Sequence, residues 1–166
     1  MSTIRGHVAL GSGQDKEWMR QTEPNFTQAA LGGFASTLVM TAMMYLVAPM
    51  IGVKMDIAGM LGSMLGGSWA AGLMMHAVNG AVIFPGLYTF VVYDRLPGSA
   101  LVKGLTFGVA LWLVQQTMVM PMMGAGILSS AMGGMMAAMG ALVGHLLYGA
   151  TLGVVASAQE QQAVTA

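Results

Sequence analysis

The chain has 166 residues, of which 56% are apolar and 7% are Asp, Glu, Lys or Arg, whereas about 25% of the residues of a soluble domain are charged. Its six basic and six acidic residues cancel. It therefore offers no clustered positive charge for phosphates, which excludes nucleic acid as a partner. Cysteine is absent, which excludes disulfides, thiolate metal sites and Cys nucleophiles. This composition predicts an all-α, polytopic membrane protein of one domain that lies in the lipid bilayer.

The chain begins with a polar tail, residues 1–27, that contains no apolar run of the length a signal peptide needs. We therefore expect the first helix to act as the insertion signal. That helix is predicted over residues 28–51 and is uncharged. Gly32 and Ser36 lie four residues apart in it, a spacing that lets another helix approach closely. Pro49 predicts a kink or an end near its far terminus.

Residues 53–67 begin with two charges and continue as a Gly- and Met-rich run that is too short to cross a bilayer. We expect a loop followed by an interfacial or re-entrant segment. The second span is predicted over residues 68–93. It ends in Tyr88 and Tyr93, and the charged turn 94–99 follows. Tyrosines followed by charges are typical of the lipid headgroup boundary.

The third span is predicted over residues 100–120, where Pro121 is expected to stop it. Residues 122–131 are an uncharged stretch of Gly, Ser and Met and predict a loop. The fourth span follows at residues 132–157, and a polar tail occupies residues 158–166. The result is a four-helix transmembrane domain over residues 28–157, made of two helical hairpins.

The basic residues predict the orientation of the chain. Loops that face the cytoplasm carry an excess of Lys and Arg, and five of the six basic residues fall on the side of the two termini. We therefore expect both termini on the cytoplasmic side of a bacterial inner membrane. The five are Arg5, Lys16, Arg20, Arg95 and Lys103, and the other side has Lys54.

The two halves of the chain resemble each other, which predicts an internal repeat. Each half has an even number of crossings, so the halves would be related by a pseudo-two-fold axis along the membrane normal. Two histidines would then lie on equivalent helices at similar depth. The matching segments are 48–52 with 120–124, 60–67 with 127–134, and 76–81 with 145–150.

His76 and His145 are the candidate site of this domain, because an ionisable residue inside a bilayer suggests a function. They could bind a haem b between them, bond neighbouring helices as structural groups, or handle protons. The spans have no acidic partner, which argues against a proton pump. Of these roles we expect the structural one, without a cofactor. Under the haem hypothesis, four glycines would leave room for the porphyrin: Gly72, Gly80, Gly144 and Gly149.

The nineteen methionines are the second group of candidate functional residues. Thioethers are soft ligands that suit Cu(I), and several methionines gather on the side away from the cytoplasm. Methionine also fills irregular apolar gaps, which is the alternative reading. The candidate copper ligands are Met60, Met64, Met120, Met122 and Met123.

The density of glycine predicts close helix contacts, either within the bundle or against a larger protein. No nucleophile elbow, zinc-protease motif or phosphate loop is present, so we expect no catalytic residue and no enzyme activity of the chain itself. The Gly-xxx-Gly pairs are Gly104 with Gly108, Gly140 with Gly144, and Gly149 with Gly153.

The paired His-x-x-[Asn/Tyr]-Gly-Ala segments and the Tyr-Asp-Arg-Leu-Pro-Gly turn at residues 93–98 resemble the small, uncharacterised four-helix inner-membrane proteins of bacteria. Some of these are similar to components found alongside haem–copper oxidases and related respiratory complexes. The resemblance implies a non-catalytic accessory subunit that packs against other integral membrane subunits. A haem- or copper-binding protein is the alternative, and a small transporter is a further one.

Overall fold

The computed structural model describes residues 26–52 and 56–157. Every regular element in these residues is helical, and four helices are long and apolar enough to cross a membrane. The all-α membrane fold is therefore confirmed. The predicted tails, residues 1–27 and 158–166, lie outside the described residues apart from residues 26 and 27. Those two residues form the start of span 1, which was predicted to begin at residue 28. The four helices are Phe26–Met50 (span 1), Trp69–Arg95 (span 2), Ala100–Met122 (span 3) and Gly134–Ala156 (span 4).

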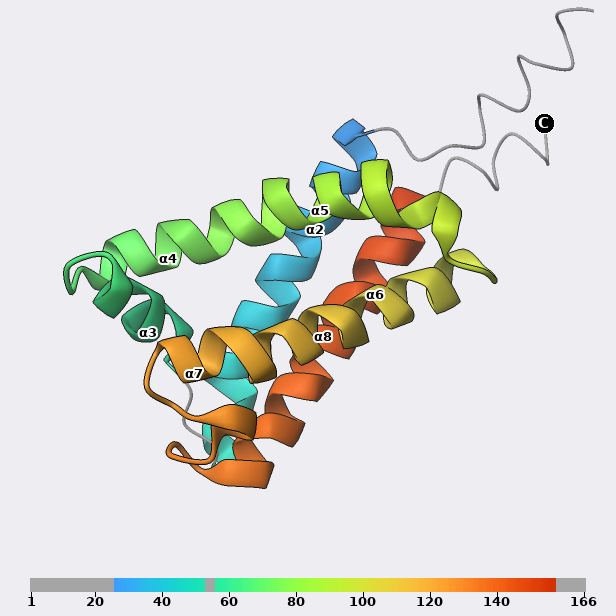
Figure 1. Cartoon of the computed structure of the whole chain (residues 1–166). Helices are drawn as coiled ribbons and strands as arrows, with labels where there is room; N and C mark the ends of the chain where they lie inside the picture. The colour runs from blue at the N-terminus through green and yellow to red at the C-terminus, as the bar shows by residue number, and fades with distance from the viewer. Residues whose placement is uncertain (1–25, 53–55, 158–166) are drawn as a thin grey trace, which may run out of the picture.

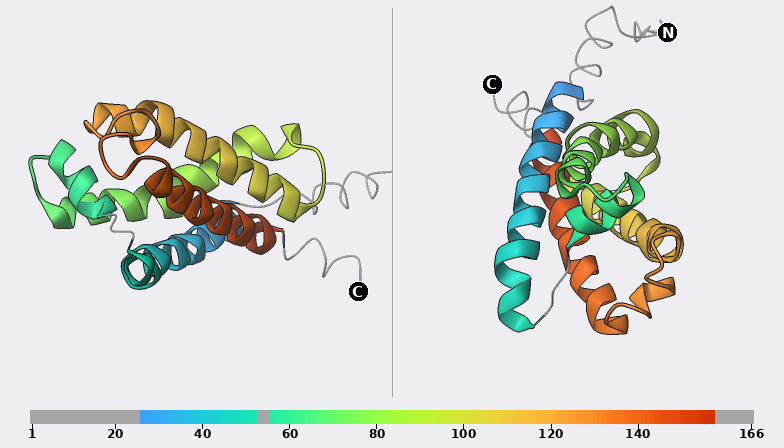
Figure 2. Two further views of the ribbon diagram at one scale, coloured as in Figure 1. Left: turned by 90° about the horizontal axis from the view of Figure 1, so that it is seen from below. Right: turned by 90° about the vertical axis from the view of Figure 1, so that its left-hand side faces the viewer.

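The spans form two layers (Figures 1 and 2). Helix α2 (Phe26–Ala42) of span 1 lies beside α8 (Gly134–Ala156), which is the whole of span 4. Span 2 and α6 (Ala100–Val114) of span 3 lie against this pair in the second layer. Because α8 packs against both α2 and α6, it is the central helix of the bundle.

Spans 2 and 3 are joined by the turn at residues 96–99 and diverge from it (Figure 1). This turn, the start of span 1 and the end of span 4 lie at one end of the bundle. The two longer connections lie at the other end. Span 2 therefore meets the bundle mainly through α2.

Three prolines lie inside the spans, and each follows a π-helical turn. A proline ring collides with the carbonyl four residues before it in an α-helix. Here the residue before each proline donates its N–H to the carbonyl five residues back, which widens the helix and accommodates the ring. The π-turns and prolines are Met43–Val47 with Pro49, Asn79–Ile83 with Pro85, and Gln115–Val119 with Pro121.

This widening explains why span 3 does not stop at residue 120. The helix continues through Pro121 as α7 (Met120–Met122). Span 1 ends in a 3-10 turn, Ala48–Ile51, and Gly52 after it adopts a left-handed conformation with φ of 78°. Pro49 thus lies close to the end of its helix.

Residues 53–67, predicted as a loop and an interfacial or re-entrant segment, contain a short helix. Residues 53–55 lie outside the described part, and α3 (Ile57–Met64) folds back on α4 (Trp69–Val78) of span 2 (Figure 1). A Cβ atom on Gly72 would lie 1.9 Å from the Ala58 carbonyl oxygen. The two helices can therefore touch only because residue 72 has no side chain.

Asp56 connects the hairpin of α3 and α4 to the end of span 1 by hydrogen bonds. Its Oδ1 accepts hydrogen bonds from the Gly59 amide at 2.9 Å, the Tyr45 hydroxyl at 2.7 Å and the Trp69 indole at 3.0 Å. The Gly59 amide and the Tyr45 hydroxyl hold the pKa of the Asp56 carboxyl below its usual value, because they stabilise the charged form. Asp56 therefore stays a carboxylate and joins three elements.

Candidate functional site

His145 lies near the middle of α8, with 7% of its surface exposed. Its Nδ1 lies 2.8 Å from the Ala141 carbonyl oxygen. Because a carbonyl can only accept, Nδ1 carries the proton and Nε2 holds the lone pair. Nε2 makes no hydrogen bond with any residue in the described part of the chain.

His76 lies on α4 and is half-buried. Its Nε2 is 3.2 Å from the hydroxyl oxygen of Thr41 on α2. This contact links span 2 to span 1 at the level of the histidines. Thr41 was not singled out from the sequence, although it follows Thr37 by one helical turn on the same helix.

The two histidine segments face each other. Tyr148, one turn after His145, donates its hydroxyl to the carbonyl oxygen of Gly80, one turn after His76, at 2.6 Å. The structure thus places the helix segments that follow the two histidines in direct contact.

The proline of span 2 explains why the Gly80 carbonyl is available. Phe84, the normal α-helical donor to this carbonyl, gives its N–H to Asn79 instead. The next residue, Pro85, has no N–H. Inside a bilayer no water replaces the missing donor, and the Tyr148 hydroxyl takes its place.

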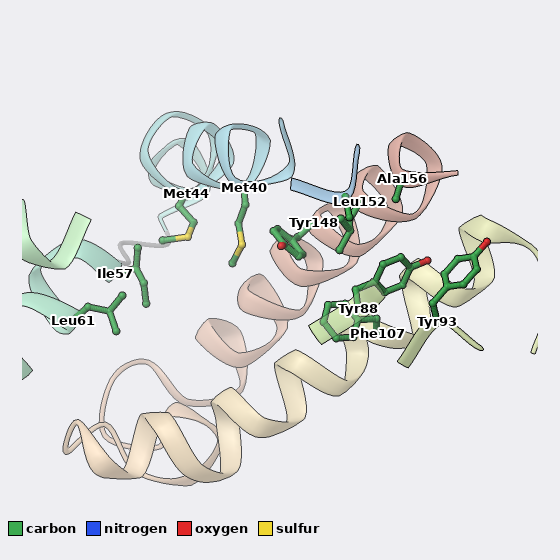
Figure 3. Packing of buried hydrophobic residues seen from close by; sticks show 11 residues of the cluster. Met40, Met44, Ile57, Leu61, Tyr88, Tyr93, Phe107, Tyr148, Leu152 and Ala156 are labelled. Atoms are coloured by element: carbon green, nitrogen blue, oxygen red, sulfur yellow. The ribbon is translucent and has the colours of Figure 1, made fainter. Parts of the chain in front are cut away.

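Met40 lies on α2 next to Thr41 and has 8% of its surface exposed. Its Cε is 3.5 Å from the Cβ position of Gly144, the residue before His145. In Figure 3 the side chain of Met40 extends from α2 toward α8 beside Tyr148. The thioether therefore packs between α2 and α8, beside Tyr148.

The glycines of α6 and α8 lie in the contact between these helices. A Cβ atom on Gly104 would lie 2.1 Å from the Gly149 carbonyl oxygen, and one on Gly149 would lie 2.2 Å from the Gly104 carbonyl oxygen. A Cβ on Gly108 would approach the His145 carbonyl oxygen to 2.3 Å, and one on Gly153 the Ala100 carbonyl oxygen to 2.4 Å. The two backbones are in direct contact along this line.

The other predicted packing residues lie mostly on α2 or against it. A Cβ on Gly32 would lie 3.2 Å from Val155 of α8, and one on Gly80 would lie 2.0 Å from the Thr37 hydroxyl oxygen. Ser36 is buried and donates to the Gly32 carbonyl at 2.6 Å. Gly140 is half-buried.

The four glycines expected to make room for a porphyrin have close neighbours in this structure. Neighbouring groups fill the space beside each of them: the Ala58 carbonyl at Gly72, Thr37 at Gly80, Met40 at Gly144 and the Gly104 backbone at Gly149. The haem hypothesis stays a prediction, and these glycines act in this structure as close packing positions.

The outer methionines do not share one surface. Met120 is in the core, with 1% of its surface exposed, whereas Met122 is 71% exposed. Met123 packs against the core cluster, and Met64 of α3 is 45% exposed. Met60 is half-buried on the same helix. The structure therefore gives these five different environments.

A second buried polar cluster was not predicted. Gln116 is fully buried in the π-turn of span 3, where its Oε1 accepts from the Ser129 hydroxyl at 3.0 Å. Leu128 and Ser129 adopt left-handed conformations with φ of 52° and 57°. The signal in the sequence was an amide pair, Gln115 and Gln116, inside an apolar span. The cluster anchors the connection between spans 3 and 4.

Comparison with known proteins gives one family. A family model described as a family of unknown function, DUF6789, matches residues 24–166. No curated protein and no solved structure matches the chain. The match includes all four spans, His76 and His145. The chain therefore belongs to the DUF6789 family.

Proposed function

We propose that this chain is a non-catalytic accessory subunit of a larger integral membrane complex. The supporting observation is that the spans differ in the share of their residues that the rest of the chain buries. In the most apolar 18 residues of span 4, 44% are buried within the chain, but in span 2 only 17% are. Span 2 lies at the edge of the bundle and leaves most of its surface for other molecules.

The uncovered flank of span 2 is a continuous stripe. Met74, Val78, Val82 and Phe90 recur at multiples of four residues, a spacing that places them on one helix face. Their exposed fractions are 68%, 45%, 49% and 70%. Gly86, at the remaining step, lies beside Phe26 of span 1, whose ring stacks on that of Phe90 at a centroid distance of 5.8 Å. The part of the stripe that is open to another helix is therefore Met74, Val78 and Val82, which offer large apolar side chains.

The partner would have to use this stripe rather than the glycine motifs. Gly104 and Gly108 of α6 and Gly149 and Gly153 of α8 already lie against the backbone of the other helix. A partner helix therefore meets large apolar side chains, which pack by van der Waals contact. The respiratory, electron-transfer nature of the partner complex and its bacterial inner membrane are part of this proposal. They rest on the resemblance of the sequence motifs.

The test is site-specific photo-crosslinking in native membranes, because lipid alone could also cover the stripe. A photoreactive residue at Val82 is expected to give a discrete adduct with a larger membrane protein. Mass spectrometry would identify that protein, and it should co-purify with the unmodified chain in mild detergent. The matched control is Leu113 on span 3, which is 48% exposed and lies outside the stripe.

Lipid adducts alone at Val82, together with purification of the chain without stoichiometric partners, would overturn the proposal. A discrete protein adduct of equal yield at Leu113 would contradict the assignment of the stripe. A reduced-minus-oxidised optical spectrum of the isolated chain tests the haem alternative in the same preparation. A b-type haem band there would make the chain a cofactor protein instead.

A further inference from the structure

We propose that Asn79 forms a hydrogen bond with a polar side chain on a membrane-spanning helix of the partner protein. This inference rests on the accessory-subunit proposal and adds the chemistry by which the partner is recognised. The partner helix would carry an Asn, Gln, Ser, Thr or His side chain at the depth of Asn79. The apolar stripe then supplies contact area, and Asn79 supplies the directional bond that distinguishes one helix from another.

Asn79 is a polar residue inside an apolar span, and its side chain makes no hydrogen bond with any residue in the described part of the chain. It is the eleventh of the 27 residues of span 2. At 1.5 Å per residue it lies about 15 Å from the start of the helix, near the middle of a hydrocarbon layer about 30 Å thick. Its amide can both donate and accept hydrogen bonds, and no water is present at this depth to pair with it. An unpaired amide there is costly.

The amide of Asn79 is accessible from outside the chain. Asn79 is half-buried, and among the described residues the enclosed side-chain atoms without a hydrogen bond belong to Tyr88, Thr89 and Ser157. The Asn79 amide is not one of them, so a group outside the chain can reach it. Val82, which belongs to the stripe, follows Asn79 by one turn and is 49% exposed. A helix that packs on the stripe would therefore lie beside Asn79.

The amides of span 3 and the tyrosine that corresponds to Asn79 in span 4 have partners within the chain. Gln116 donates its Nε2–H to Gln115 Oε1 at 3.0 Å. Tyr148 occupies the place of Asn79 in the second His-x-x-[Asn/Tyr]-Gly-Ala segment and donates to the Gly80 carbonyl at 2.6 Å. The chain thus pairs these polar groups internally and leaves the Asn79 amide for a group from outside.

A protein helix suits this position better than lipid does. The polar groups of phospholipids lie at the bilayer surface, whereas the acyl chains at the depth of Asn79 offer no hydrogen bond. Asn, Gln, Ser, Thr and His side chains form hydrogen bonds between helices inside membranes. The partner that satisfies the amide is therefore a spanning helix with such a residue.

The first measurement compares the wild type with Asn79→Leu for binding to the protein captured at Val82. Leucine is similar in size to asparagine and has no hydrogen-bonding group. The full chain is titrated in detergent with that purified protein, and we expect Asn79→Leu to raise Kd about three- to twentyfold, the range for one interhelical hydrogen bond. Asn79→Gln keeps the amide and should bind more tightly than Asn79→Leu. Peptide sequencing of the Val82 adduct should place an Asn, Gln, Ser, Thr or His of the partner within one helical turn of the attachment point.

The second measurement separates a contact with the partner from a structural role of Asn79. The isolated full chain with Asn79→Leu should be at least as stable to unfolding in detergent as the wild type, because no hydrogen bond within the chain is lost. Gln115→Leu is the matched control, since it makes the same kind of change but removes the acceptor of the Gln116 amide. This control should lower the stability of the isolated chain and leave the Kd for the partner unchanged.

An unchanged Kd for Asn79→Leu, or an equal rise of Kd in Gln115→Leu, would overturn this inference and leave the accessory-subunit proposal standing on the Val82 adduct. Lower stability of the isolated Asn79→Leu chain would make Asn79 a structural residue and contradict the inference in the same way. The absence of a protein adduct at Val82, or an adduct made of two copies of this chain, would refute both proposals.

Discussion

Tyr148 stabilises the fold through a single hydroxyl that replaces a missing backbone donor. Pro85 has no N–H, and Phe84 donates to Asn79, so the Gly80 carbonyl depends on the Tyr148 hydroxyl at 2.6 Å. Tyr148 has 3% of its surface exposed, which leaves no water to substitute. The same bond connects the helix segments that follow His76 and His145.

Tyr148→Phe should therefore lower the free energy of unfolding by about 1–2 kcal/mol, the range for an interhelical hydrogen bond whose loss leaves a buried carbonyl unpaired. The variant keeps the aromatic ring and its edge-to-face contact with Phe84, whose ring centroid lies 6.2 Å away. Thermal or SDS-induced unfolding in detergent measures the change. Thr117→Val is the control, because the Thr117 hydroxyl bonds only within its own helix, to Leu113. Equal stability of both variants would contradict the role of Tyr148.

At the scale of the element, the spans rely on two local devices. Glycine allows α6 and α8 to approach until their backbones touch, and a π-turn allows a proline to remain inside a helix. The π-turns before Pro49 and Pro121 occupy matching places in the two halves, but the one before Pro85 has no counterpart in α8, which is α-helical throughout. The connections also differ, since the first half has α3 and the second has the 3-10 turn Ile127–Ser129. The internal repeat therefore stays a prediction.

Gly149→Ala should separate α6 from α8, because the new Cβ would lie 2.2 Å from the Gly104 carbonyl oxygen. Backbone atoms cannot move aside as a flexible side chain can. We expect a loss of about 1–3 kcal/mol of unfolding free energy from overpacking, even though alanine is the better helix former by about 1 kcal/mol.

Gly86→Ala is the matched control for that loss. Its Cβ would meet only Phe26 Cε2, at 3.5 Å, an ordinary contact, so this variant should unfold at the same free energy as the wild type or a higher one. Both variants are measured by the same unfolding assay. A Gly149→Ala variant as stable as Gly86→Ala would mean that the two helices can part without cost.

At the scale of the whole molecule, hydropathy was enough to predict the four spans. Their ends lie within two residues of the predicted ones, because charges, prolines and polar turns mark the edges of apolar runs. The sequence also suggested the two histidines, because ionisable groups are rare in spans. Thr41 could not be predicted as a neighbour of His76, nor Met40 as a neighbour of Gly144, since an apolar span contains many methionines and threonines that pack without any other role. The rotation of each helix decides which of them face inward.

The orientation of the molecule remains a prediction that the absence of cysteine makes easy to test. With more Lys and Arg on the side of the termini, we expect the turn between spans 2 and 3 on the cytoplasmic side and α3 on the other. Pro97 in that turn and Ser63 on α3 are both exposed, and the turn and α3 lie at opposite ends of the bundle (Figure 1). In spheroplasts, a membrane-impermeant maleimide should label Ser63→Cys and should label Pro97→Cys only after the membrane is permeabilised. The opposite pattern would invert the topology, and labelling of both in intact spheroplasts would contradict a membrane-spanning bundle.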